Sequence, residues 1–225
     1  MEFIVAVGTN QISQVSANEL QGVLKVFQNR MATIGCPWSA ELAGENRISV
    51  KIDPEGKEQI EQARLLLTRI GVVEFRLVHE ESEKLLRDGI VPPGFEMLNE
   101  PRPAATGQKL SIPQLVSKKA VPGMAGQKFS RVTMGRDDIG RSEIMFEFDQ
   151  GGALAFERVT TENVGRNLAI VLDREICSAP RIAGPISGGR GSITAAFDDQ
   201  EARMLITILK YPLETPAKLI EERRF

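Results

Sequence analysis

The sequence predicts an α+β fold in two parts: a sandwich of strands and helices that is split in the chain, and a second α+β domain inserted into it. Residues 1–80 alternate strand and helix patterns, and residues 194–225 return to the same style with a helix and a strand. Residues 81–193 differ from both in composition and in the pattern of apolar residues. Because apolar faces of helices and strands must cover one another in layers, separated segments of one style are expected to share one core. We therefore expect a split domain, 1–80 with 194–225, and an inserted domain, 81–193.

The opening elements of the split domain have clear local signals. A strand is expected at Phe3–Val7. Ser16 opens a helix, because Glu19 completes a capping box with it, and Gly35 is a natural stop. The buried face of this helix is expected to carry Leu20, Val23, Leu24, Phe27, Met31 and Ile34. Arg47–Ile52 alternates apolar and polar residues, which is typical of a half-buried strand.

A second helix and a further strand follow. Asp53 is expected to cap the helix, with Pro54 in its first turn, and Gly71 to end it. Val72–Val78 then forms a strand of β-branched and aromatic residues. The chain start therefore reads as strand, helix, strand, helix, strand.

The inserted domain begins with a segment that is poor in regular structure. Residues 89–126 hold six of the twelve prolines and five of the twenty glycines of the chain. Such a composition does not sustain long helices or central strands. We expect extended surface chain here, with one helical turn near Ile112–Lys118. The segment either binds an extended peptide or is a mobile surface loop.

Regular structure resumes after this segment. Strands are expected at Lys128–Met134 and Glu143–Phe148, followed by an amphipathic helix from Gly152. An apolar strand at Leu168–Leu172 leads into a turn at Asp173–Arg174 and a second strand that ends near Ala179–Pro180. A glycine cluster and a third strand, Ser192–Phe197, complete the domain.

The tail of the chain returns to the split domain. Asp198 is expected to cap a helix, with Glu201 three residues later. Pro212 ends that helix, and Ala217–Glu221 is expected to form a closing strand.

Composition excludes several classes of function. The chain has 225 residues, a formal charge of −2 and 5% aromatic residues. This charge gives no field that would attract nucleic acid, and scarce aromatics argue against a stacking platform for single strands. We therefore expect no nucleic-acid partner. No apolar run approaches the ~20 residues of a membrane-spanning helix. Met1 and Glu2 offer no basic segment of a signal peptide, so none is expected.

Motifs that could carry chemistry have simpler explanations. Gly188–Ser192 lacks the lysine of a phosphate loop and precedes a strand, so a hairpin turn with positive φ explains its glycines. His79 is the only histidine, too few for a histidine-rich zinc site, and is expected partly exposed at a strand end. Asp137–Asp138 reads as a turn, and Asp198–Asp199 as a helix cap.

The two cysteines complete the search for reactive groups. Cys36 and Cys177 have no histidine partner that the sequence suggests, so a thiol nucleophile is not expected. A disulfide between them would clamp the two domains together, and we expect two free thiols instead. No catalytic residue, no cofactor-binding residue and no metal ligand is assigned, and the chain is not expected to be an enzyme.

Six segments in order resemble the first large extracytoplasmic domain of the SecD/SecDF protein-export family. They are Ala32–Gly35 with Asn46–Val50, Gly71–Val78, Asn163–Asp173, Ser178–Pro180, Pro185–Gly189 and Leu213–Arg223. These are similar to the family's "NRI" strand, "EFRLV" strand, "NVGKPLAIVLDG", "SAP", "PITGG" and "LPAPLxIxEER". Arg174 departs from the pattern, because it stands where a turn glycine is common.

This resemblance implies a fold and a place in the cell. It implies a ferredoxin-like base near the membrane that is split by an inserted head, on the extracytoplasmic (periplasmic) side of the bacterial cell membrane. It implies contact with the membrane only through helices absent from this chain. The implied partners are unfolded secretory polypeptide, SecF and the Sec channel. The family's proton-relay residues lie in membrane helices, so none is carried over.

The hypothesis that follows is mechanical. The head is expected to hold emerging polypeptide and to move relative to the membrane part during export driven by the proton gradient. Hinge residues are expected at Glu80, Glu81, Ile193 and Thr194, and the polypeptide-binding residues are unknown. Two alternatives stay open: a periplasmic adaptor for a folded partner, or a small-molecule enzyme on a ferredoxin-like scaffold. An exposed apolar groove favours the first hypothesis, and a flat polar patch favours the adaptor.

Overall fold

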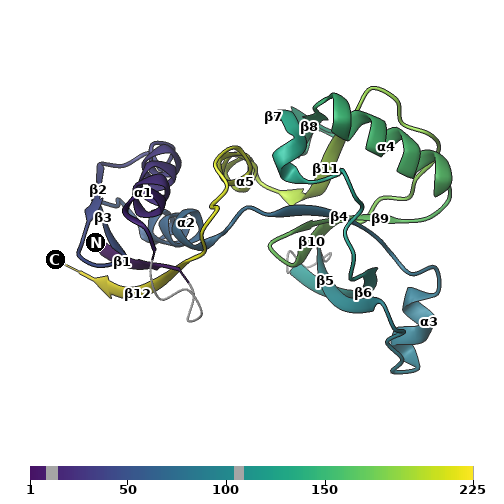
Figure 1. The fold of residues 1–225 in the computed structure, drawn as a ribbon, viewed down its shortest axis with the longest axis horizontal. Helices are drawn as coiled ribbons and strands as arrows, with labels where there is room; N and C mark the ends of the chain where they lie inside the picture. Colours follow the sequence, from purple (N-terminus) through teal and green to yellow (C-terminus); the bar gives the residue numbers. More distant parts are fainter. Residues whose placement is uncertain (9–14, 104–108, 225) are drawn as a thin grey trace. The chain divides into compact units, whose positions relative to one another are not determined.

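The structure is a computed structural model that describes residues 1–8, 15–103 and 109–224 (Figure 1). It has a mixed α+β fold with several small antiparallel sheets. The chain divides into two compact units. The first contains residues 1–71 and 207–225, and the second contains residues 72–206.

The first unit has the element order β-α-β-β-α-β. Its elements are β1 (Glu2–Val7), α1 (Ala17–Met31), β2 (Trp38–Leu42), β3 (Arg47–Ile52), α2 (Lys57–Thr68) and β12 (Ala217–Arg223). The sheet order is β12-β1-β3-β2, and every neighbouring pair is antiparallel. The expected closing strand is therefore confirmed, because β12 pairs with β1 although some 210 positions separate Val7 from Ala217 in the chain.

Local signals explain most of these elements. Ser16 and Glu19 form the expected capping box at the start of α1. In β3 the buried residues Ile48, Val50 and Ile52 alternate with more polar ones, as expected. The expected cap of α2 is wrong: Gly56 occupies the N-cap position, three residues after Asp53, and makes no side-chain cap. The strand β2 was not expected from the sequence.

The second unit contains a larger set of strands. They are β4 (Val73–Leu77), β5 (Phe95–Pro103), β6 (Lys109–Ser117), β7 (Phe129–Arg136), β8 (Ser142–Phe148), β9 (Leu168–Leu172), β10 (Glu175–Ser178) and β11 (Arg190–Phe197). The helical elements are α3 (Ser82–Arg87), the short 3-10 helix η1 (Gly126–Lys128) and α4 (Gln150–Glu162), and α5 (Asp199–Lys210) begins in this unit and ends in the first. Its sheets have the orders β10-β9-β4, β11-β8-β7 and β5-β6.

The sheet β10-β9-β4 is the middle layer of this unit, and both its faces are covered (Figure 1). Side chains alternate between the faces of a strand. On one face, Val78, Val171 and Ile176 pack with Leu98 and Val116 of the β5-β6 ribbon. All residues of β9 are buried, which explains why this strand is a continuous apolar run without alternation.

The segment 89–126 corrects one expectation. It was expected to be poorly regular with a helical turn near Ile112–Lys118, yet β5 and β6 form a long antiparallel ribbon across it. The ribbon accommodates prolines such as Pro101 and Pro113, because alternate residues of a two-stranded ribbon direct their main-chain groups away from the partner strand. The helix α3, just before this segment, was also not expected.

The boundaries of the units lie at 71/72 and 206/207, outside the expected 80/81 and 193/194. Pairing explains the difference. β4 pairs with β9, and β11 pairs with β8, so both strands belong to the second unit. The sequence pattern of β4 indicates a buried strand, but it does not indicate which unit the strand belongs to.

A fully buried arginine organises the first unit. Arg30, on α1, has no exposed surface. Its guanidinium donates to the carbonyl oxygens of Leu66, Arg69 and Ile70 at 2.7, 2.6 and 3.1 Å, and to that of Tyr211 at 2.8 Å. The last turn of a helix leaves carbonyls without partners inside the helix, and a cation there also meets the negative end of the helix dipole. Arg30 therefore joins α1 to the end of α2 and to the residue after α5.

We expect Arg30→Met to lower the free energy of unfolding of the first unit by about 3 kcal/mol or more, because it leaves buried carbonyl oxygens unpaired. Urea unfolding followed by the fluorescence of Trp38, the single tryptophan and a residue of this unit, measures the change. The control is Lys25→Met on the exposed face of the same helix, with an effect within about 0.5 kcal/mol. Equal stability of the two variants would contradict the role of Arg30.

Candidate functional site

A cluster of phenylalanine rings forms the core between β4, the sheet β11-β8-β7 and α4. Phe75 lies on β4, Phe129 on β7, Phe146 and Phe148 on β8, and Phe156 on α4. Neighbouring ring centroids are 4.9 to 6.4 Å apart, mostly in tilted or edge-to-face pairs. Such pairs contribute about 0.5–1.5 kcal/mol each beyond the burial of their area. The cluster is therefore a rigid apolar floor.

A pocket of about 500 Å³ lies on this floor. Phe75, Phe146 and Phe156 line it from the core side. The remaining lining residues are Thr160, Leu168, Ile170, Pro180, Arg181, Ile182, Ala183, Gly184, Pro185, Ile186, Gly191 and Ser192. Arg181, Ala183 and Pro185 are exposed, so the pocket reaches the surface. The lining is mainly apolar, with Arg181 as its charged residue.

The segment Pro180–Ile186 forms one wall of the pocket and is fixed by hydrogen bonds. The Pro180 carbonyl accepts from the Leu168 amide at 3.0 Å, and the Ile182 carbonyl accepts from the Gly165 amide at 2.8 Å. The Ile186 amide donates to Oγ1 of Thr160 at 2.9 Å. This wall therefore belongs to the end of α4 and to β9, not to the neighbouring strand β11.

Glycines shape the opposite wall. A Cβ atom at Gly191 would lie 2.5 Å from Cζ of Phe146, so only glycine leaves room for that ring beside β11. Gly188 and Gly189 have φ of +83° and +69°, which confirms the expected positive φ. The expected hairpin is wrong, because β11 pairs with β8 and not with the strand that precedes it.

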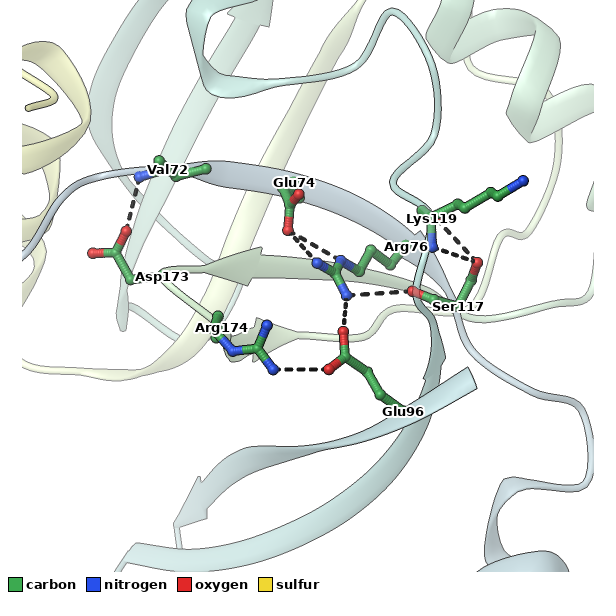
Figure 2. Close-up of polar contacts among 8 residues, drawn as sticks. All are labelled: Val72, Glu74, Arg76, Glu96, Ser117, Lys119, Asp173 and Arg174. Carbon is green, nitrogen blue, oxygen red and sulfur yellow. Dashed lines mark hydrogen bonds and ion pairs between the residues drawn. The ribbon is translucent and has the colours of Figure 1, made fainter. Parts of the chain in front are cut away.

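An ion cluster lies on the other face of β4 (Figure 2). The side chain of Arg76 is 7% exposed, and it donates to Glu74 at 2.6 Å and to Glu96 on β5. Glu96 also accepts from Arg174 at 2.8 Å. Asp173, beside Arg174, accepts from the Val72 amide at 2.9 Å. The cluster thus ties β4, the β5-β6 ribbon and the β9–β10 turn together.

The backbone of this turn is unusual. Asp173 and Arg174 have φ of +49° and +70°, a region that non-glycine residues rarely adopt. The departure from the glycine that the resemblance makes common here is therefore explained: Arg174 accepts an unfavourable backbone conformation, and its guanidinium gains the contact with Glu96.

The ion cluster shifts the protonation of its members. The hydrogen bond from Arg76 holds the pKa of the Glu96 carboxyl below its ordinary value, burial opposes this, and Arg174 lowers it further. Burial acts to lower the pKa of Arg76, but the hydrogen bonds to Glu74 and Glu96 outweigh it and raise that pKa. Both shifts favour the charged forms of Glu96 and Arg76.

A second, polar hollow of about 710 Å³ lies beside α3. Two of the expected hinge residues line it: Glu80 pairs with Arg166 at 3.2 Å, and Glu81 with Lys84 at 3.1 Å. The other two lie in β11, where Ile193 is 2% exposed and Thr194 is exposed. All four lie inside the second unit, so bending there would deform that unit. The hinge assignment stays a prediction.

The other residues considered from the sequence have structural roles. His79 follows β4, half-buried as expected, with its ring 4.7 Å from that of Phe95. Asp137 closes the β7–β8 turn by accepting from the amides of Ile139 and Arg141 at 3.1 and 2.8 Å. Asp198 caps α5 by accepting from the amides of Gln200 and Glu201 at 2.9 and 2.7 Å, as expected.

Cys36 and Cys177 lie in different units, and no disulfide joins them. Burial raises the pKa of the Cys36 thiol, and the charges of Asp53 and Glu55 add to this. A raised pKa disfavours the reactive thiolate. Among the described residues, no three His, Cys, Asp or Glu side chains gather as a metal site would require. Within the same residues, no helix is long and apolar enough to cross a membrane.

Sequence reasoning missed the pocket itself. Its lining comes from β4, β8, α4, β9, β11 and the segment 180–186, and no pattern in the chain brings these together. The available signal was the resemblance of Ser178–Pro180 and Pro185–Gly189 to family motifs. Those motifs lie at and around the pocket wall, but no role was assigned to them.

We expect Glu96→Gln to lower the stability of the second unit by about 1–2 kcal/mol at pH 7, since a charged hydrogen-bond partner is lost. The pKa of Glu96 is depressed in the folded state, so its contribution is present above the unfolded pKa of about 4.3 and is lost as the pH falls through the folded value. The difference from the unsubstituted protein should therefore shrink from pH 7 to pH 3.

Hydrogen exchange of the β4 amides as a function of pH measures this effect, because Trp38 and Tyr211 both report on the first unit. Glu157→Gln, on the exposed face of α4, is the matched control with little effect at either pH. A Glu96→Gln deficit that stays constant from pH 7 to pH 3 would rule out the ion cluster as its cause.

Comparison with known proteins gives a consistent result. The family described as SecDF, P1 head subdomain, matches residues 97–212, which is more than half of the chain. SecD of Magnetococcus marinus is 31% identical over 203 residues, covering 89% of this chain and 38% of that protein. SecD of Syntrophobacter fumaroxidans is 30% identical over 227 residues, covering 99% and 42%. The chain thus spans about two fifths of the length of these relatives.

A solved structure of SecDF, described as a membrane component that enhances protein export, has the same fold. Its TM-score is 0.69 at 23% identity, with 100% of both chains covered. The family match, the relatives along nearly the whole chain and the common fold agree. This chain therefore belongs to the SecD/SecDF family and is its periplasmic P1 domain.

Proposed function

We propose that the apolar pocket of the second unit holds short stretches of unfolded secretory polypeptide during export. The observation that supports this most directly is the pocket of about 500 Å³ above the phenylalanine cluster, open at Arg181, Ala183 and Pro185. An open apolar hollow on a soluble domain is commonly an interaction site. An emerging polypeptide exposes the apolar side chains that such a hollow accepts.

The size of the pocket limits the affinity for polypeptide, because it limits how many apolar side chains can be buried. Each apolar side chain that the pocket buries contributes about 1.5–3 kcal/mol. Two such side chains supply about 3–6 kcal/mol before the cost of ordering the peptide is subtracted, which corresponds to dissociation constants no tighter than about 40 µM. Weak binding suits the function, because a holding site must also release the polypeptide.

We further propose that the first unit is a ferredoxin-like base and that the second is the inserted head. The β-α-β-β-α-β order with the sheet order β12-β1-β3-β2 supports this assignment. In the full-length protein, the head would move relative to the membrane part in export driven by the proton gradient. SecF and the Sec channel are the partners that family membership suggests. In this proposal the membrane is reached through helices outside this chain.

A periplasmic adaptor that binds a folded partner is the alternative function. The polar hollow beside α3 is the feature that would favour it, since folded surfaces are recognised through polar and charged rims. Photocrosslinking distinguishes the two. A crosslinker at Arg181, which is exposed at the pocket, should capture a translocating polypeptide in the full-length protein, and one at Lys84, at the polar hollow, should not. Repeated capture of one folded partner from Lys84, with none from Arg181, would favour the adaptor.

Gln114, which lies in the segment 89–126, is unsuited to carry a crosslinker. Its side chain is 8% exposed and lies near Ser82 and Glu100 inside the unit. A bulky group there would disturb the fold.

We expect Ile186→Glu to weaken peptide binding at least about tenfold, because it puts a carboxylate into the apolar pocket. The probe is a short fluorescein-labelled peptide that alternates Val and Ala between terminal Asp residues, and fluorescence anisotropy gives the affinity. The control is Ile139→Glu, the same change at a residue that is 73% exposed on the β7–β8 turn, outside the pocket. Equal affinity of the two variants would contradict the pocket as the binding site.

A further inference from the structure

The strand β11 is an edge strand that borders the pocket. It is the terminal strand of the sheet β11-β8-β7, and Gly191 and Ser192 line the pocket. The Phe148 amide donates to the Gly189 carbonyl at 2.9 Å, which fixes the phase of the β11–β8 ladder. Hydrogen-bonded pairs alternate along an antiparallel ladder, so Gly191 bonds to Phe146 of β8. The main-chain groups of Arg190 and Ser192 are then directed away from β8, to the edge.

The pocket wall does not use these edge groups. Pro180–Ile186 makes its hydrogen bonds to residues 160, 165, 166 and 168, at the end of α4 and the start of β9. Within the part of the chain that the structure describes, no strand pairs with β11 on this side. An edge strand with free amide and carbonyl groups is a template for another extended chain.

We propose that the polypeptide held in the pocket binds as an added strand, pairing with the β11 edge at Arg190–Ser192. This inference rests on the function proposed above and specifies how the pocket recognises its polypeptide. Strand addition takes its affinity from main-chain hydrogen bonds and its selectivity from pockets for alternate side chains. Exported polypeptides differ in their side chains, but all of them have the same main-chain amide and carbonyl groups. The edge and the pocket together therefore select an extended segment with apolar residues at every second position.

The charged residues near the pocket opening indicate which kind of polypeptide segment the pocket would bind. The charged residues between positions 180 and 192 are Arg181 and Arg190, both exposed, and Glu147 pairs with Arg190 at 3.5 Å. This stretch has no acidic residue. Acidic residues that flank an apolar segment would meet the arginines favourably, and lysines there would be repelled. The occupant we infer is an extended apolar segment with acidic flanks.

Backbone methylation of the peptide tests strand addition with the unsubstituted protein. Two versions of the Val–Ala peptide carry N-methyl groups either on the Val amides or on the Ala amides. In an added strand only alternate amides bond to β11, so one version should bind at least about tenfold more weakly and the other within about twofold of the parent. Replacement of the terminal Asp residues by Lys should weaken binding about fivefold at low salt.

The outcomes separate the two proposals. Binding of the parent peptide with equal effects of both methylation patterns overturns strand addition and leaves the pocket proposal standing. Absence of any binding by the parent peptide overturns both. Lys-ended peptides that bind as well as Asp-ended ones overturn the inferred acidic flanks.

A proline substitution tests the same edge from the side of the protein. Ser192→Pro removes an amide that the β11–β8 ladder does not use, so the strand should persist while peptide binding weakens at least about tenfold. The control is Ala40→Pro in β2, an edge strand of the first unit. Two hydrogen bonds of 2.9 Å fix the phase of the β2–β3 ladder: the Asp53 amide donates to the Pro37 carbonyl, and the Ala43 amide donates to the Arg47 carbonyl. Because hydrogen-bonded pairs alternate, the Ala40 amide also faces away from its ladder.

Circular dichroism and thermal unfolding test whether both proline variants fold. If Ser192→Pro does not fold, the methylated peptides alone test strand addition, because they use the unsubstituted protein. We expect Ala40→Pro to bind the peptide within about twofold of the unsubstituted protein. Folded Ser192→Pro with undiminished affinity would overturn the assignment of the β11 edge.

Discussion

The buried guanidinium of Arg76 is the interaction on which the arrangement of the second unit depends. It lies on β4 next to Phe75, and strand alternation puts these two side chains on opposite faces. Phe75 joins the phenylalanine cluster, and Arg76 joins the carboxylates of Glu74 and Glu96. A buried charge without partners is strongly unfavourable, so the ribbon strand β5 must bring Glu96 to it. One strand thus fixes both covering layers.

This double coverage explains how the unit can keep an apolar pocket open. The strand β9 is buried on both faces, and the segment 180–186 is held by hydrogen bonds to its start and to α4. Because these bonds position the wall, the pocket does not need a ligand to hold it apart. Gly191 contributes by the absence of a side chain, since the ring of Phe146 occupies the space where a Cβ would lie.

The sequence predicts those features that short-range physics determines. The capping box at Ser16, the cap at Asp198 and the alternation in β3 are local, and each is present in the structure. The ribbon was missed because a proline-rich segment was taken to be irregular, although a two-stranded ribbon tolerates proline at its free edges. The pocket could not be predicted, because Phe75, Phe156 and Ile182 meet only through tertiary packing.

In the proposed function, the same long-range packing would combine weak binding of polypeptide with little dependence on its sequence. An apolar pocket alone would favour particular side chains, and its affinity would rise with each one that it buries. A strand edge alone would accept any extended chain, including a second copy of this protein. Next to each other, the pocket supplies a modest free energy and the edge supplies an orientation, because an extended chain must lie along β11 to place its alternate side chains in the hollow. In the proposed binding mode, Arg181 beside the opening would disfavour segments rich in lysine. A site built in this way can hold many polypeptides briefly and none of them permanently.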